Sequence, residues 1–154
     1  MNRAQAIKFG TDKLKEHGLY QDGWRMQIDS RPKRRLGQCR YDLKEIAVSS
    51  WCLNGGVAEG KVENTIIHEL AHSLTRGDGH GRLWKQKCVE LGIDPQRCAT
   101  QDQIVEAPKA KYSIRCCGCE KIIGNRHRTS KLIRNPFHFR SNCCKADLKI
   151  LTNF

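Results

Sequence analysis

The chain has 154 residues and a formal net charge of +12, with 38% hydrophobic and 29% charged residues. This length suits one ordinary domain or a small domain with an appendage, and the composition excludes a collagen-like or generally disordered protein. No apolar run approaches the roughly 18 residues that a membrane span needs, and the first residues lack the apolar core of a secretory signal. We therefore expect a cytoplasmic protein that does not enter a membrane.

The first third of the chain predicts a helix followed by strands. Residues 1 to 18 have the pattern of an amphipathic helix that buries residues such as Ala6 and Leu14 and ends at Gly18. Apolar residues then alternate with polar ones in "WRMQI" and again in "EIAV", which is the period of β-strands. The polar segments "DSRPKRR" and "DLKE" are expected to connect successive strands. The arginine-rich segment is either a solvated loop or a second contact for phosphate.

Two further helices are predicted in the middle of the chain. Residues 62 to 75 carry a wide apolar stripe at helical spacing, which is typical of a core helix, and Gly77 ends it. A shorter helix is predicted over residues 81 to 91. Its apolar side consists of Leu83, Trp84, Cys88 and Leu91.

The nine cysteines are unevenly distributed. Four are scattered and are expected to be small buried apolar residues: Cys39, Cys52, Cys88 and Cys98. The other five form two tight clusters after the linker "EAPKAK", residues 106 to 111. In a chain without a secretory signal, such clusters favour thiolate metal ligands over disulfides. We therefore predict two domains, residues 1–107 and 108–154.

The segment "IIHELAHSL" contains the pattern H-E-x-x-H. His68 and His72 are four residues apart, so on a helix they project from one face, one turn apart, and can hold one cation. Glu69 lies about 100° further round the helix, where it can reach a water molecule at the metal without binding the metal. Ionisable side chains on so apolar a helix are costly to bury without partners. The pattern predicts two zinc ligands and a general base.

A catalytic zinc takes three protein ligands and leaves a fourth position for water. His80 in "RGDGHG" is the preferred third ligand, because its flanking glycines allow the chain to reverse toward the helix. Glu90, on the following helix, is the alternative. The spacing differs from the metzincin pattern.

The cysteine clusters predict a second metal site. Cys116 and Cys119 form a C-x-x-C pair, and twenty-three residues separate it from Cys143 and Cys144. This spacing is typical of a structural zinc, which replaces a core that so short a segment can scarcely supply. Because adjacent cysteines are awkward chelators, Cys117 or His138 stays an alternative ligand.

The segment from residue 108 onward carries eleven Lys and Arg against two acids. A compact segment this basic is typical of nucleic-acid binding, so a nucleic acid is the expected partner. The candidate contacts are Arg126, Arg128, Lys131 and Arg134. Phe137 and Phe139 either stack on bases or form the small core of this domain.

The motifs "TIIHELAHSL", "HGRLWKQKCVELGIDP" and the upstream "RLGQCRYDLKEIAVSS" resemble the SprT-like zinc metalloproteases, which include the Spartan proteases. The resemblance covers essentially the whole chain and is strongest over residues 36 to 95. It implies an α+β fold with a zincin-like core, in which helices pack on a small sheet around a central H-E-x-x-H helix, followed by a β-rich zinc ribbon. It also implies that His68, His72 and His80 bind the catalytic zinc and that Glu69 is the base.

These inferences predict a zinc-dependent endopeptidase with one catalytic and one structural zinc. A zinc-activated water attacks the peptide carbonyl, and Glu69 accepts its proton and delivers it to the leaving amine. The strand "EIAVSS" is expected to align the peptide by strand addition. Similarity to the Spartan group implies DNA-associated or DNA-crosslinked protein substrates, and hence DNA–protein crosslink repair. The alternatives are a nucleic-acid-binding zinc protein with a non-proteolytic site and a peptidase that recognises acidic proteins.

Overall fold

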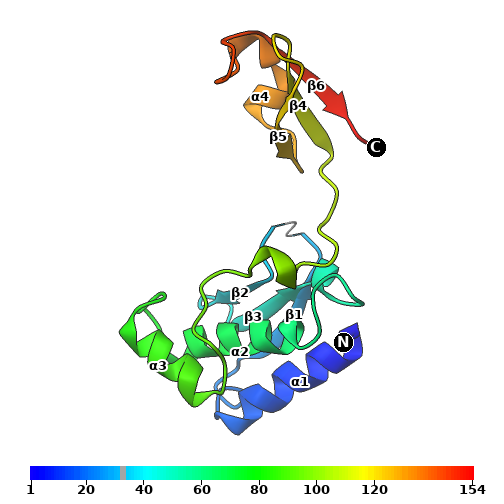
Figure 1. Ribbon diagram of the computed structural model, residues 1–154. Helices are drawn as coiled ribbons and strands as arrows, with labels where there is room; N and C mark the ends of the chain where they lie inside the picture. Colours follow the sequence, from blue (N-terminus) through cyan, green and yellow to red (C-terminus); the bar gives the residue numbers. More distant parts are fainter. Residues whose placement is uncertain (32–33) are drawn as a thin grey trace. The chain divides into compact units, whose positions relative to one another are not determined.

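The computed structural model describes residues 1–31 and 34–154 (Figure 1). Residues 32–33 of the predicted "DSRPKRR" connection lie outside the described residues. The chain divides into two compact units, Met1–Ala107 and Pro108–Phe154, which we call the N-terminal and C-terminal units. Each unit has its own three-stranded sheet. In the part of the chain that is described, no helix combines the length and apolar character that crossing a membrane requires.

The N-terminal unit is a small mixed sheet with helices packed on it (Figure 1). Its elements in chain order are α1 (Arg3–Glu16), β1 (Arg25–Asp29), β2 (Gly37–Arg40), β3 (Glu45–Ser49), η1 (Ser50–Cys52), α2 (Lys61–Leu74), α3 (Arg82–Glu90) and η2 (Gln101–Gln103). The strand order is β1-β3-β2, with β1 parallel and β2 antiparallel to β3. Helices α1 and α2 pack against each other and the sheet, and α3 packs against α2. This arrangement confirms the predicted α+β class.

Helix α1 begins at a reciprocal capping interaction. The Asn2 side chain accepts a hydrogen bond from the Gln5 N–H at 3.0 Å, and the Gln5 side chain accepts one from the Asn2 N–H at 2.8 Å. The buried side includes Leu14, as predicted, and also Gly10. A Cβ at Gly10 would lie 2.6 Å from the side chain of Met26, so this glycine lets α1 pack closely on β1.

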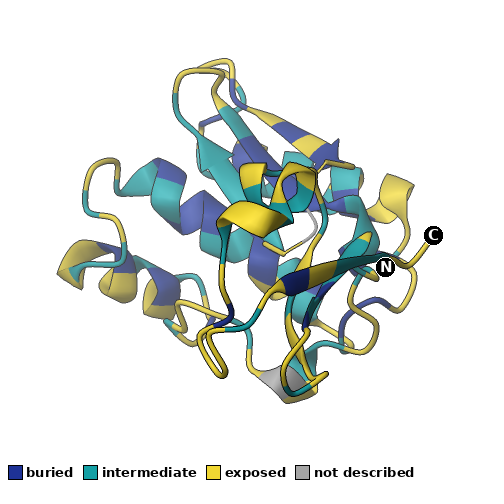
Figure 2. Ribbon diagram, turned by 90° about the horizontal axis from the view of Figure 1, so that it is seen from above, coloured by how far each residue is buried: buried dark blue, intermediate teal, exposed yellow. Residues whose placement is uncertain are grey.

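The core of the N-terminal unit lies between the sheet and α2. Ile46 and Val48 of β3 are buried with Ile66 and Leu70 of α2. The alternation expected for β3 is wrong at Ala47, which is also buried, because β3 is the central strand and both of its faces are covered. Figure 2 shows the buried residues concentrated in the helices and strands, whose outer faces carry exposed residues.

Two burial predictions are wrong. Leu83 is 53% exposed, although its neighbour Trp84 is fully buried, because only Trp84 faces α2 at this point of α3. Cys98 is also exposed, since it lies in an irregular segment rather than on a core-facing helix or strand. Cys39 is partly buried, whereas Cys52 and Cys88 are buried as predicted.

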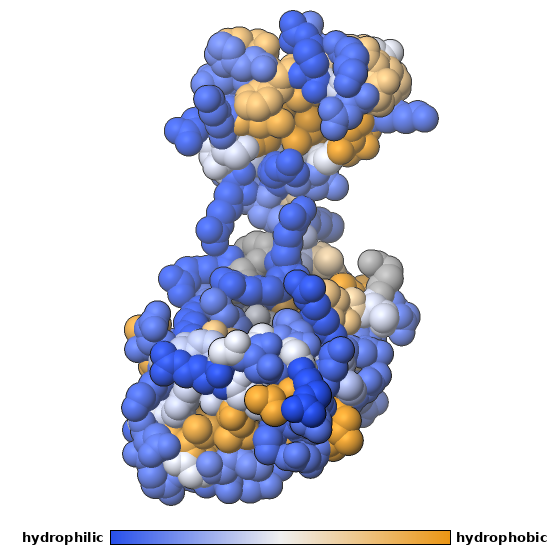
Figure 3. All heavy atoms as spheres, turned by 90° about the vertical axis from the view of Figure 1, so that its left-hand side faces the viewer, coloured by the Kyte–Doolittle hydropathy of each residue, from blue (hydrophilic) through white to orange (hydrophobic). Residues whose placement is uncertain are grey.

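The C-terminal unit has an antiparallel sheet with the strand order β5-β4-β6. Its elements are β4 (Tyr112–Cys116), β5 (Ile122–Arg126), α4 (Lys131–Arg134), η3 (Pro136–His138) and β6 (Leu148–Thr152). The two short helices were not predicted, and α4 begins where the Ser130 hydroxyl accepts a hydrogen bond from the Ile133 N–H. Among the described residues the buried apolar side chains are few: Ile114, Cys116 and Leu148. Figure 3 shows apolar groups scattered between hydrophilic side chains on the surface of both units.

Two candidate metal centres

Three histidines converge in the N-terminal unit. His68 and His72 project from α2, and His80 comes from the loop between α2 and α3. The Nε2 atom of His80 lies 3.2 Å from Nε2 of His72 and 3.3 Å from Nε2 of His68. A tetrahedral zinc with nitrogen ligands at about 2.05 Å places those nitrogens about 3.3–3.4 Å apart. These two spacings fit a single zinc ion, and the ligand atoms of all three histidines lie within 4.8 Å of one another.

The alternative third ligand, Glu90, is not part of this group. Its carboxylate is 60% exposed on α3 and forms an ion pair with Lys87. The structure therefore brings His80, and not Glu90, to the histidines of α2.

The loop that presents His80 is held at both ends. Gly79 has a φ of +60°, which favours glycine and turns the chain after α2. The carboxylate of Asp78 accepts a hydrogen bond from the Trp84 N–H at 2.9 Å and so caps α3. A Cβ at Gly81 would lie 2.6 Å from that carboxylate, so only glycine fits beside the cap. These contacts fix the backbone on either side of His80.

Trp84 packs against all three histidines. Its ring centroid lies 4.8 Å from that of His68, 5.3 Å from that of His72 and 4.5 Å from that of His80. Because Trp84 is fully buried, it restricts the directions in which the imidazoles can turn.

Opposing effects act on the pKa of the two helical histidines. A backbone hydrogen bond at Gln96 raises the pKa of His68, and one at Gly79 raises that of His72. Burial, and then the neighbouring histidines, lower the pKa of His68 and of His72 to about 4, so both rings are neutral at pH 7.

Glu69 is buried beside the histidines with only 7% of its surface exposed. Burial raises the pKa of Glu69 to about 8, although a hydrogen bond from the Cys39 backbone and the charge of Arg35 oppose the shift. A Cβ at Gly37 of β2 would lie 2.7 Å from Oε1 of Glu69. The absence of a side chain at this point lets the strand approach the carboxylate closely.

The histidine group opens on a cavity of about 790 Å³. The cavity is lined by residues 34–39 and Tyr41, by α2 residues from Lys61 to His72, by Gly79 and His80, and by the irregular segment after α3 up to Ile104. Glu69 and all three histidines are among the lining residues. A ligand in the cavity would therefore contact the metal group and the carboxylate together.

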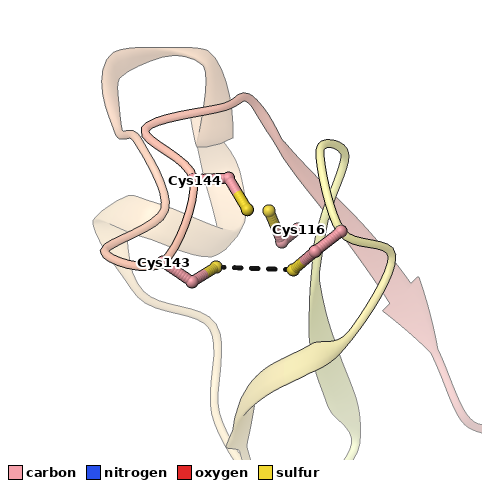
Figure 4. Close-up of side chains that lie close together, drawn as sticks. Cys116, Cys143 and Cys144 are labelled. Carbon is pink, nitrogen blue, oxygen red and sulfur yellow. Dashed lines mark hydrogen bonds between the residues drawn. The ribbon is translucent and has the colours of Figure 1, made fainter.

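Four cysteines form a second group in the C-terminal unit: Cys116, Cys119, Cys143 and Cys144. Their sulfur atoms all lie within 4.8 Å of one another, and Sγ of Cys119 lies 3.6 Å from Sγ of Cys143. Figure 4 shows the side chains of Cys116, Cys143 and Cys144 pointing toward a common centre. Zinc–sulfur bonds of about 2.3 Å in a tetrahedron place the sulfurs about 3.8 Å apart, so this group also fits zinc.

The alternative ligands lie outside the cysteine group. Cys117 is exposed, and neither Cys117 nor His138 is among the grouped residues. The adjacent cysteines fit because Gly118 leaves room: a Cβ there would lie 2.9 Å from Cβ of Cys144. The hydroxyl of Ser141 lies 3.2 Å from Sγ of Cys116. This hydrogen bond, together with backbone hydrogen bonds at Cys119 and Gly118, lowers the pKa of Cys116 to about 6, which favours the thiolate.

The predicted nucleic-acid contacts are exposed side chains of the C-terminal unit: Arg126, Arg128, Lys131 and Arg134. Arg126 ends β5, and Lys131 and Arg134 lie on α4. Phe137 is 64% exposed and its ring centroid lies 4.3 Å from that of His138, so it is not a core residue. Phe139 is partly buried.

Sequence reasoning did not assign a role to several residues that build the histidine site. Gly37, Asp78 and Trp84 act through the contacts described above, and the Tyr41 hydroxyl donates a hydrogen bond to the backbone carbonyl of His72 at 3.0 Å. Such contacts join elements that are distant in the chain, so no local pattern reveals them. The only signals in the sequence were the glycines on either side of His80 and the tryptophan that follows it.

Three convergent imidazoles beside a buried carboxylate define a candidate metal-dependent hydrolase. A family model described as "SprT-like family" matches residues 6–102, which contain the whole histidine site. The chain belongs to the SprT-like family, and this membership indicates a metallopeptidase-type function. Comparison with curated proteins and with solved structures found no match.

The two ligand groups predict two zinc ions per chain. We expect elemental analysis of the purified protein to find about two, and to find about one after His80→Ala, because two imidazoles without a third ligand hold zinc poorly. Glu90→Ala is the matched control and should retain both ions. If Glu90→Ala loses one zinc and His80→Ala keeps both, Glu90 and not His80 is the third ligand.

The cysteine group predicts different outcomes for substitutions at two exposed cysteines. Cys144→Ser should lose the zinc of the C-terminal unit and lower its melting temperature, because a structural zinc contributes roughly 10 kcal/mol or more to folding. Cys117→Ser should keep the zinc and change the stability by less than about 0.5 kcal/mol, as for most surface substitutions. Zinc content and thermal unfolding measure both effects. Equal zinc loss in the two variants would show that the ligand set is wrong.

Proposed function

We propose that the protein is a zinc-dependent endopeptidase of the H-E-x-x-H…H type, with His68, His72 and His80 as the zinc ligands and Glu69 as the general base. One observation carries the proposal: three Nε2 atoms converge at zinc-ligand spacing beside a buried carboxylate from the same helix. Membership of the SprT-like family supports it.

Glu69 is suited to moving a proton in this site. When bound, zinc lowers the pKa of a coordinated water toward about 7 and polarises a substrate carbonyl. The Glu69 carboxylate accepts the proton of the attacking water and delivers it to the leaving amine. The backbone of Cys39 and the bare α-carbon of Gly37 hold the carboxylate in place during both transfers.

The peptide should lie along β2 and not along β3, which the sequence had favoured. Both edges of β3 are paired with other strands, so β3 cannot accept an added strand. In contrast, β2 pairs with β3 on one edge only, and its residues Gly37, Gln38 and Cys39 line the cavity. An extended peptide beside β2 would place its carbonyl groups close to the histidine group.

A purely structural or regulatory histidine site is less well supported. Structural zinc sites are closed by four protein ligands, whereas this group has three and opens on a cavity. A buried carboxylate with a pKa raised to about 8 is also costly to keep, and such groups are common at catalytic sites.

We further propose that the C-terminal unit is a zinc ribbon that holds the enzyme on DNA, and that the substrates are proteins associated with or crosslinked to DNA. Its two acids, Glu120 and Asp147, form ion pairs with Arg115 and Arg140. Nine further Lys and Arg then provide positive charge that phosphates can neutralise. The exposed ring of Phe137 offers a surface on which a base can stack.

The Glu69→Gln variant should fold and retain its zinc but cleave unstructured proteins such as casein about 10²–10⁴-fold more slowly, because the ligands stay while the base is removed. Proteolysis is followed by electrophoresis, with and without DNA and with a DNA-binding protein as a second substrate. Unchanged turnover in Glu69→Gln would remove Glu69 from the mechanism.

The double substitution Lys131→Gln and Arg134→Gln should weaken DNA binding and flatten its dependence on salt, because each phosphate that a cation neutralises adds about one unit to the salt slope. Arg3→Gln with Lys85→Gln is the control, since it removes the same charge from exposed positions of the N-terminal unit. Fluorescence anisotropy with a labelled oligonucleotide at several salt concentrations measures both. If the two double variants bind equally, α4 is not the contact surface.

A further inference from the structure

The cavity at the histidine site is lined by more positive than negative side chains. Its cations are Arg34, Arg35, Lys61 and Arg97. Its carboxylates are only Asp94 and the buried Glu69. None of the four cations forms an ion pair within 4.0 Å of a carboxylate of the described residues, although the charges of Asp102 and Asp94 act on Lys61.

These cations approach the site from different elements. Arg34 and Arg35 immediately precede β2, Lys61 is the first residue of α2, and Arg97 lies in the segment between α3 and η2. The positive charge of the cavity therefore comes from three separate segments of the chain.

The cations share the cavity with the proposed reaction centre. Arg35, Lys61 and Arg97 line the same cavity as Glu69 and the three histidines, so a ligand that enters it can contact both sets of residues.

Unpaired cations in a cavity repel one another, and the low-dielectric walls concentrate their field on whatever enters. A bound zinc ion would add further positive charge. The missing counter-charge is therefore expected on the ligand. Carboxylate side chains fit this need, because guanidinium groups bind them with paired hydrogen bonds.

We propose that the cleft selects peptide segments with Asp or Glu on both sides of the scissile bond, and that Arg35 and Arg97 are the residues that determine this specificity. This inference rests on the proposed peptidase function. A peptide is favoured over nucleic acid because the same cavity is lined by residues of β2, an edge strand to which an extended peptide can be added. The positively charged C-terminal unit offers DNA a separate surface.

The test uses three fluorogenic peptides that differ only in the residues on either side of the central bond, which are Glu, Gln or Lys. At low salt we expect the full-length protein to cleave them with kcat/KM in the order Glu, Gln, Lys. The Glu peptide should exceed the Gln peptide by about tenfold, since each exposed charge pair contributes roughly two- to fivefold. Added salt should reduce this ratio.

The double variant Arg35→Gln and Arg97→Gln should bring the Glu-to-Gln ratio close to one. Lys85→Gln is the matched control, because Lys85 is an exposed cation of α3 that does not line the cavity. This control should keep the full ratio. A wild-type ratio of one, or a ratio that survives the double variant, would overturn the inference.

A second measurement separates this inference from the peptidase proposal. The affinity of the same peptides is measured by anisotropy with the Glu69→Gln protein, which retains the cations. Tighter binding of the Glu peptide, with no cleavage of any peptide by the wild type, would reject the peptidase and keep the acidic specificity. Equal binding of all three peptides would reject the specificity. A short oligonucleotide is also tested as a competitor of peptide binding. If it displaces the peptides from the Glu69→Gln protein, but no longer does so once Arg35→Gln and Arg97→Gln are added, these cations bind phosphate and the inference is overturned.

Discussion

The packing of α3 against α2 is the constraint on which the histidine site depends. Helical periodicity alone brings His68 and His72 together, but His80 reaches them only when Trp84 is seated between the helices. Trp84 belongs to a small buried cluster with Ala71, Cys88 and Ile93. The same tryptophan thus stabilises the helix pair and packs against the imidazoles, so the site cannot form without this part of the core. The Asp78 cap extends the arrangement to the loop itself.

Strand β2, at the edge of the sheet, contributes the other residues of the site. A buried carboxylate loses solvation, and Glu69 keeps part of its stabilisation from the Cys39 backbone of β2. Gly37 makes this approach possible, because any larger residue would occupy the space of the carboxylate. The strand that contacts the Glu69 carboxylate is also the edge strand whose residues line the cavity. In the proposed mechanism, substrate alignment and the position of the base would therefore depend on one short element.

Local patterns in the sequence predicted the parts of the fold that depend on neighbouring residues. Helices α1, α2 and α3 and the alternating strand β1 follow from apolar spacing, and the α+β class is confirmed. The central place of β3 was missed, since strand order depends on pairing between distant segments. Leu83 was misplaced because one position of helical rotation decides which neighbour faces α2. The histidines were found because helix spacing and metal chemistry constrain the same residues, and their role as zinc ligands stays a prediction.

The two metal groups differ in ways that suit different tasks. The histidine group offers three neutral nitrogen ligands, leaves a coordination position free and opens on a cavity, as chemistry on a substrate requires. The cysteine group offers four sulfurs, which complete a tetrahedron and leave no position for substrate. Its unit buries few apolar side chains, so a metal there would replace the missing core. The family match ends before this unit. Its eleven Lys and Arg and its four grouped cysteines are those of a basic module held together by a structural metal, as the proposed function requires.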